Sequence, residues 1–151
     1  MKKRILILDD DKDILDILEE ILVYEDFDVA IVESTDDLCN LVRAYQPSLI
    51  LLDFSLNGMD GGEWCTKLKI DPEFAHIPVI IFSAYSNKGI SKGTYGCDDF
   101  IDKPFDLEDL LARINLLTVV RYSLCFKETQ QAQMPLGRIA KTIAVRQGNE
   151  F

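Results

Sequence analysis

The sequence has few of the residues that build metal and disulfide frameworks. Its four cysteines (Cys39, Cys65, Cys97 and Cys125) are scattered and form no Cys-x-x-Cys pair. This spacing argues against both a zinc site and a set of structural disulfides, and it is typical of reduced thiols in a cytoplasmic protein. The one histidine, His76, stands in a predicted loop without matching ligands and indicates surface structure.

Long apolar runs are also missing. No run approaches the roughly 20 residues that a membrane-spanning helix needs. The N-terminal Met-Lys-Lys-Arg precedes a short Ile-Leu-Ile-Leu and then three aspartates. A signal peptide needs a longer apolar stretch and a small-residue cleavage site. The sequence therefore predicts neither a membrane span nor a cleaved leader.

Positive charge is scarce over most of the 151 residues. Residues 1–122 carry 24 acidic and 12 basic side chains, a net charge of −12, whereas residues 123–151 carry 2 acidic and 4 basic ones, a net charge of +2. An acidic surface repels nucleic-acid phosphates, and the basic tail is too short for an ordinary DNA-binding domain. We therefore expect no direct binding to nucleic acid.

Short apolar runs alternate with amphipathic stretches along the chain. Strands are predicted near 4–8, 28–33, 48–53, 77–82 and 98–102, and helices near 13–25, 35–45, 61–70 and 106–122. The first, third and fourth strands are almost entirely apolar, as is typical of strands covered on both faces. The alternation favours an α/β fold, a doubly wound parallel sheet with right-handed crossovers. Asp106, with Asp109 in the following turn, predicts a helix N-cap.

Polar residues follow four of these strands. They are the run Asp9-Asp10-Asp11, the single Asp53, the pair Ser83-Ala84 and the pair Lys103-Pro104. The carboxyl ends of parallel strands lie side by side, and ligands bind in the crevice beyond them. The fold would thus gather carboxylates, a hydroxyl and an ammonium group in one place, a mixture that suits a divalent cation together with a phosphoryl group.

Each of these residue types has a role in that chemistry. The carboxylate of Asp53 can attack phosphorus and hold the group as an aspartyl phosphate. Crowding Asp9 and Asp10 beside it is unfavourable unless a cation offsets the repulsion, and Mg²⁺ or Mn²⁺ accepts such oxygen ligands. Lys103 would pair with phosphoryl oxygens as a compact point charge, and Ser83 would donate a hydrogen bond to the bound group. Asp11, which follows Asp10, and Asp60, in the loop after Asp53, are predicted to be helix-start or turn residues.

In this order, the acidic pair, the acceptor Asp53, Ser83 and Lys103-Pro104 resemble the receiver domain of two-component response regulators, over about residues 3–122. The resemblance implies a CheY-like, flavodoxin-like sheet of order 2-1-3-4-5, with a receiver domain at 1–122 and a C-terminal extension at 123–151. It also implies a phosphorylation switch. A separate histidine kinase or phosphotransfer protein would supply the phosphoryl group, and a downstream effector protein would read the result.

The same resemblance implies finer roles. Asp10 and Asp53 would bind the metal directly, Asp9 would act mostly through water, and the backbone carbonyl of Ser55 would complete the protein ligands. Phe100 matches the switch aromatic of the family, with a plain core phenylalanine as the alternative. The Lys-Pro bond is often cis in the family. The chain would not be an enzyme beyond Mg²⁺-dependent self-phosphorylation and autodephosphorylation.

The segment 86–96 departs from the family pattern. Gly89, Gly93 and Gly96 would each cost a helix interior about 1 kcal/mol relative to alanine. We therefore expect an irregular or shortened fourth helix near 86–95. The departure leaves open a second reading, a degenerate receiver that acts as a phosphorylation-independent scaffold.

A third reading is a haloacid-dehalogenase-like phosphatase, because Asp9-x-Asp11 fits the first motif of those enzymes. Their later acidic pair follows the lysine, however, whereas Asp98-Asp99 precede Lys103. This reading would also leave Asp53 without a role.

The C-terminal part of the chain leaves several uses open. Residues 116–126 are more apolar than one helix face requires, which indicates a homodimer contact or a docking site for the tail. Further on, Leu136, Ile139, Ala140 and Ile143 fall at helical spacing beside basic residues. This pattern suits a small amphipathic helix for a partner, a helix resting on its own domain, or a disordered end.

Overall fold

The computed structural model describes residues 1–84 and 94–129, without the side chains of residues 94 and 120–129. The chain divides into two compact units, Met1–Pro104 and Phe105–Phe151. The irregular helix predicted near 86–95 lies outside the described residues except at its end. There, Thr94–Gly96 form a single 3-10 turn, η1. The amphipathic helix predicted around 136–143 lies outside them as well.

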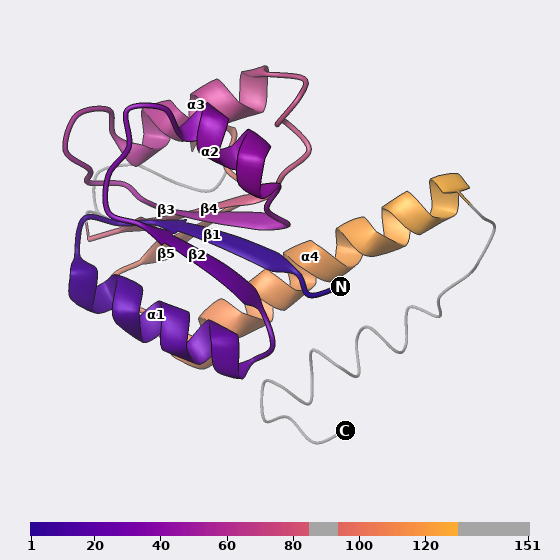
Figure 1. Ribbon diagram of the computed structural model, residues 1–151, viewed down its shortest axis with the longest axis horizontal. Coiled ribbons are helices and arrows are strands. Elements are labelled where there is room, and N and C mark those ends of the chain that lie inside the picture. Colours follow the sequence, from indigo (N-terminus) through magenta and orange to yellow (C-terminus); the bar gives the residue numbers. More distant parts are fainter. Residues whose placement is uncertain (85–93, 130–151) are drawn as a thin grey trace. The chain divides into compact units, whose positions relative to one another are not determined.

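The first unit contains a five-stranded parallel sheet. Its elements in chain order are β1 (Arg4–Leu8), α1 (Lys12–Tyr24), β2 (Asp28–Val32), α2 (Leu38–Tyr45), β3 (Leu49–Asp53), α3 (Gly61–Ile70), β4 (Val79–Ser83), η1 and β5 (Asp99–Asp102). The strands lie in the order β2-β1-β3-β4-β5, and every pairing is parallel. Helix α1 covers one face of the sheet, and α2 and α3 cover the other (Figure 1). The predicted α/β fold and strand order are confirmed.

The three central strands form the middle of the hydrophobic core. The apolar residues of β1, β3 and β4 from Ile5 to Leu8, from Leu49 to Leu52 and from Val79 to Phe82 are all buried. Edge strand β2 is half-buried over most of its length. Strands covered on both faces need apolar residues at every position, which is why their sequences do not alternate. The polar residues at their carboxyl ends are therefore positioned by fully packed strands.

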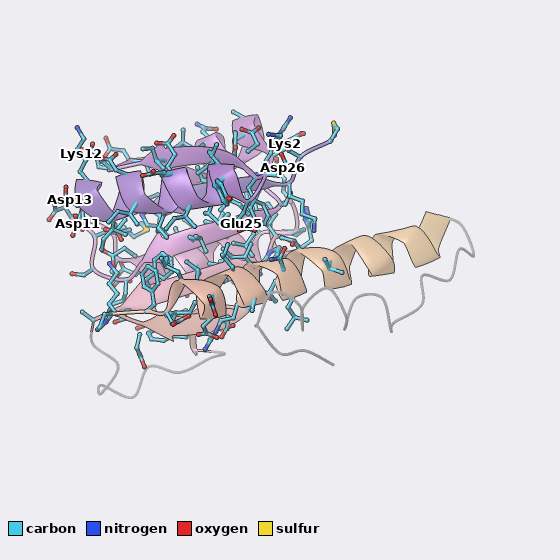
Figure 2. All side chains as sticks on the ribbon, turned by 90° about the horizontal axis from the view of Figure 1, so that it is seen from below. Lys2, Asp11, Lys12, Asp13, Glu25 and Asp26 are labelled. Atoms are coloured by element: carbon cyan, nitrogen blue, oxygen red, sulfur yellow. The ribbon has the colours of Figure 1, made fainter. Side chains whose placement is uncertain are left out.

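Helix α1 begins at the end of the acidic run. The carboxylate of Asp11 accepts hydrogen bonds from the backbone N–H groups of Asp13 and Ile14, as an N-cap does. Figure 2 shows Asp11 and Asp13 at this end of α1, with Lys2 and Asp26 near the other end, where they form a 2.9 Å ion pair. The prediction that Asp11 is a helix-start residue is confirmed.

Cys39, Cys65 and Cys97 form no disulfide. Cys65 and Cys97 are buried in the core of the first unit. Burial, with a smaller contribution from Cys97, raises the pKa of the Cys65 thiol to about 12. These two thiols act as small apolar core residues.

The second unit contains α4 (Leu107–Thr129). The Asp106 carboxylate accepts the backbone N–H of Asp109 at 2.9 Å, which confirms the predicted cap. The helix continues past its predicted end at residue 122, because no glycine or proline interrupts the sequence up to Thr129. Within residues 1–84 and 94–129, every helix is too short or too polar to cross a bilayer.

Candidate functional site

Parallel strands bring the predicted site residues to one edge of the sheet. Asp9 directly follows β1, Asp53 ends β3, Ser83 ends β4 and Lys103 directly follows β5. One carboxylate oxygen from each of Asp9, Asp10 and Asp53 lies within 4.8 Å of the others. The structure thus brings the three carboxylates together where the strands end.

Lys103 lies between two of the carboxylates. Its Nζ is 3.0 Å from Asp9 Oδ2 and 3.1 Å from Asp53 Oδ1. Asp9 is 0% exposed and Asp53 is 4% exposed, whereas Asp10 is exposed at the surface. The backbone N–H of Lys103 donates to the carbonyl of Ser83 at 2.7 Å, which fixes where the lysine leaves the sheet. The Lys103–Pro104 peptide bond is cis.

The carboxylates of this cluster outnumber its ammonium group, that of Lys103. Burial raises the pKa of the Asp53 carboxyl to about 6, the Lys103 hydrogen bond opposes this shift, and the Asp9 charge adds to it. For Lys103, burial acts to lower the pKa, but the hydrogen bonds and charges of Asp9 and Asp53 outweigh it and raise the pKa. The ammonium therefore stays charged. Three carboxylates around it leave an excess of negative charge that a further cation would offset.

The loop after Asp53 folds tightly back onto α3. The backbone N–H of Phe54 donates to the Phe82 carbonyl at 2.7 Å, and that of Gly61 donates to the Phe54 carbonyl at 2.9 Å. A Cβ on Gly61 would overlap the carbonyl oxygen of Asp53, so only glycine fits this approach. The backbone around Asp53 is thus tightly packed on both sides.

The Asp60 side chain starts α3 and stays outside the carboxylate cluster. It accepts the Glu63 N–H at 2.8 Å, while Glu63 Oε2 accepts the Asp60 N–H at 3.1 Å. This reciprocal pair is a capping box. The prediction that Asp60 is a helix-start residue is confirmed.

The remaining predicted residues lie around the cluster. Ser83 is buried at the end of β4, and Ser55 is exposed in the loop after Asp53. Phe100 is half-buried, packs against the main core cluster and pairs in register with Ile81. This is the position of a core phenylalanine, and its switch role stays a prediction.

A partly buried ion pair joins Lys69 and Asp98, and the sequence does not predict it. Lys69 Nζ lies 2.6 Å from Asp98 Oδ2 and donates to the carbonyls of Ile77 at 2.7 Å and Ala75 at 3.4 Å. The same Asp98 oxygen accepts the Val79 N–H at 2.8 Å. Asp98 therefore joins α3 to the amino ends of β4 and β5, away from Asp53. No local sequence pattern indicates a pair whose members are 29 residues apart.

A comparison with family models matches residues 5–115 to the response regulator receiver domain. Among curated proteins, the response regulator PleD of Caulobacter vibrioides is 36% identical over 135 residues, covering 88% of this chain and 29% of PleD. The DNA-binding response regulator MtrA of Mycobacterium tuberculosis is 34% identical over 119 residues, covering 76% of this chain and 50% of MtrA. The chain spans half or less of the length of these curated relatives.

Solved structures give the same picture. The CheY-like response regulator receiver domain protein of Methanospirillum hungatei superposes with a TM-score of 0.73 at 28% identity, covering 81% of this chain and 98% of that one. The signal receiver domain of a histidine kinase from Syntrophus aciditrophicus also gives 0.73, at 26% identity, with 89% and 99% covered. The family match covers most of the residues that form the sheet and its strand-end cluster. The chain therefore belongs to the response regulator receiver domain family.

Proposed function

We propose that this chain is a phospho-accepting switch of a two-component system, in which Asp53 takes the phosphoryl group. The observation that carries the proposal is the gathering of Asp9, Asp10 and Asp53 around Lys103 at one edge of the sheet. Phosphoryl transfer depends mainly on positioning and on neutralising charge. Fully packed strands position the cluster, and its Lys103 ammonium group supplies positive charge.

The donor set fits Mg²⁺ or Mn²⁺. Both ions prefer oxygen ligands, and the three carboxylates hold more negative charge than Lys103 neutralises. Asp10 and Asp53 would bind directly, Asp9 mostly through water, and the backbone carbonyl of Ser55 would complete the protein ligands. When bound, the ion offsets negative charge on the phosphoryl oxygens.

The chain's own residues carry the transfer. A carboxylate oxygen of Asp53, ionised at neutral pH because its pKa is about 6, attacks the phosphorus of the donor. The new oxygen–phosphorus bond forms as the bond to the donor's leaving group breaks. Lys103, already beside Asp53, pairs with the phosphoryl oxygens, and the Ser83 hydroxyl donates to them. A movement of Ser83 and Phe100 that follows the phosphoryl group would then change the surface that an effector binds.

The partners follow from the same role. Donors would be a cytoplasmic histidine kinase or a phosphotransfer protein, and the output would be a change in binding to an effector protein. The acidic body of the chain does not favour direct contact with nucleic acid. A homodimer through residues 116–126 is a further proposal, and the side chains beyond residue 119 lie outside the described part.

The test is intact mass after incubation with Mg²⁺ and acetyl phosphate. We expect a gain of one phosphoryl group that requires Mg²⁺ and is lost in Asp53→Asn. Asp11→Asn is the matched control, because it removes a carboxylate of the same acidic run that caps α1. A gain that persists in Asp53→Asn would contradict the acceptor assignment. No gain in the wild type, from acetyl phosphate or from a phosphorylated histidine donor, would favour a degenerate receiver.

A haloacid-dehalogenase-like phosphatase is disfavoured by two observations. Asp11, which that reading needs as a catalytic residue, is committed to the N-cap of α1. Asp98 is committed to its pair with Lys69. Sustained hydrolysis of a phosphate ester that depends on Asp9 but not on Asp53 would contradict our proposal.

A further inference from the structure

The side chain of Tyr95 lies against the loop that carries Asp53. Its ring contacts the ring of Phe54, with 5.9 Å between the centroids and 42° between the planes. On the α3 side, a Cβ placed on Gly62 would lie only 2.8 Å from the Tyr95 ring atoms Cε2 and Cζ. The ring therefore fits because residue 62 has no side chain. Tyr95 and Gly62 form a complementary pair from segments far apart in sequence.

The backbone of Tyr95 adopts an uncommon conformation to make these contacts. Its φ and ψ are 63° and 6°, in the left-handed region that bulky residues rarely occupy. Gly96 follows at φ 74°, where glycine is at no disadvantage. A bulky aromatic residue held in such a conformation needs compensating contacts, and it justifies a hypothesis of function. Here the compensating contacts are those with Phe54 and Gly62.

Both of these ring contacts are with residues that lie next to Asp53 or to the backbone packed against it. Phe54 directly follows Asp53, and Gly62 lies in the first turn of α3, beside the Gly61 backbone that touches the Asp53 carbonyl. From Tyr95 the chain also runs through β5 to Lys103, which contacts Asp53 from the other side. One short segment thus contacts both flanks of the acceptor.

We propose that Tyr95 is a positioning residue for phosphoryl acceptance. By packing between Phe54 and Gly62, its ring fixes the acceptor loop and so the direction of the Asp53 carboxylate relative to Asp9 and Asp10. This inference rests on the proposed function of Asp53. Misplacement of a reacting group by about 1 Å can cost up to about 100-fold in rate, so a small shift of this loop has a measurable effect.

Three variants test the proposal. Tyr95→Asn removes the ring but keeps a residue that tolerates the left-handed conformation. Tyr95→Phe keeps the ring and loses only the hydroxyl. Gly62→Ala leaves Tyr95 unchanged and pushes its ring away. Ile70→Ala is the matched control, because Ile70 lies on the same helix with its side chain exposed.

Two quantities are measured for each variant at a temperature where its melting curve shows it folded. The first is the rate of phosphoryl uptake from acetyl phosphate at saturating Mg²⁺. The second is the affinity for Mg²⁺ alone, followed by fluorescence of Trp64, the single tryptophan, which lines a small cavity together with Leu8 and Asn57. We expect uptake to slow about tenfold in Tyr95→Asn and about fivefold in Gly62→Ala, with Mg²⁺ affinity reduced severalfold in both. Tyr95→Phe and Ile70→Ala should stay within about twofold of the wild type.

The outcomes separate this inference from the proposed function. Wild-type rates and affinities in a folded Tyr95→Asn variant would overturn the positioning role, even if its melting temperature falls. If Tyr95→Asn does not fold, the same comparison with Gly62→Ala decides. If the wild type binds Mg²⁺ but takes up no phosphoryl group, the proposed function fails, and the Mg²⁺ affinities alone judge Tyr95. A wild type that binds no Mg²⁺ overturns both.

Discussion

Two partly buried lysines lie at opposite ends of the sheet, and their surroundings differ. The side chain of Lys69 is 14% exposed and that of Lys103 is 17% exposed. Lys69 pairs with one carboxylate, Asp98, and fills its remaining donors with backbone carbonyls. Lys103 pairs with the two carboxylates of Asp9 and Asp53, with Asp10 close by.

The contrast is between a charge-balanced ion pair and a cluster in which carboxylates outnumber the ammonium group. Around Lys69 the charges balance, and Asp98 also accepts a backbone N–H, so nothing further is required for the pair to be satisfied. Around Lys103, the described residues supply more negative than positive charge. A buried excess of charge is costly unless something else binds there. We therefore propose that the strand-end cluster binds a ligand, whereas the Lys69 pair stabilises the fold.

The largest expected effect comes from removing each lysine. Lys69→Met leaves Asp98 partly buried without its cation, and we expect it to lower the free energy of unfolding by about 3 kcal/mol, whether or not Mg²⁺ is present. Lys103→Met should also destabilise the metal-free protein, but Mg²⁺ should restore much of the loss because the three carboxylates can share that ion. Urea unfolding with and without Mg²⁺ checks both. Equal stabilisation of the two variants by Mg²⁺ would contradict the proposed difference between the two lysine sites.

The next effect is a pH dependence of stability. In the folded protein the pKa of Asp53 is raised to about 6, above the value of about 4 expected in the unfolded chain. The folded state then holds more protons in this window, so the ionised carboxylate lowers stability as pH rises from about 4 to about 6. Asp53→Asn lacks this cost and should be more stable than the wild type by about 1 to 3 kcal/mol at neutral pH without divalent cations.

Urea unfolding of both proteins across this pH range, with a chelator present, measures the difference. The advantage of Asp53→Asn should disappear below about pH 4, where both states of the wild type hold the proton. Asp98→Asn is the comparison at the other end of the sheet, and it should destabilise the protein at neutral pH. A destabilising Asp53→Asn would show that Asp53 is already satisfied by Lys103.

A smaller effect is expected at the helix cap beside the site. Asp60→Ala removes the capping box of α3 and should cost about 1 kcal/mol. The cap supports the helix without adding charge to the cluster, so the stabilisation by Mg²⁺ should match that of the wild type. Thermal melts with and without Mg²⁺ measure both quantities. Loss of the Mg²⁺ response would mean that Asp60 belongs to the site.

The smallest effect is expected at the Arg43–Glu73 pair. Its two hydrogen bonds, at 2.8 and 3.0 Å, join side chains that are about half exposed. Exposed pairs of this kind contribute little, because water and salt screen them. Neither Arg43→Ala nor Glu73→Ala should change the midpoint of urea unfolding measurably. A clear loss in both, with coupling in the double variant, would give this pair a structural role like that of Lys69.

The sequence predicts the residues at the carboxyl ends of the strands better than the Lys69–Asp98 pair at the amino ends. Asp9 and Asp53 directly follow apolar runs, and Lys103 follows the last predicted strand. Parallel strand ends lie side by side, so the convergence of these residues follows from the local pattern together with the strand order that the family resemblance implies. The pairing of Lys69 with Asp98 depends instead on where the last turn of α3 meets the start of β5. That contact is set by packing between distant segments, which a single sequence does not display.

The same limit applies to Tyr95 and Gly62. A glycine near a helix start and a tyrosine in a glycine-rich segment carry no pattern that links them, and only the contact of ring and backbone shows their relation. Helix α4 extends to Thr129, beyond the predicted end at residue 122. The sequence itself contains no helix-breaking residue before Thr129.

We propose that the excess of negative charge around Lys103 is a metal-binding site, whereas the Lys69 pair is not. A Mg²⁺ titration of the melting temperature tests it most directly in the wild type, Asp53→Asn and Asp98→Asn. Mg²⁺ should raise the melting temperatures of the wild type and Asp98→Asn by similar amounts, and Asp53→Asn should lose most of this response. Equal Mg²⁺ responses in all three proteins would contradict it.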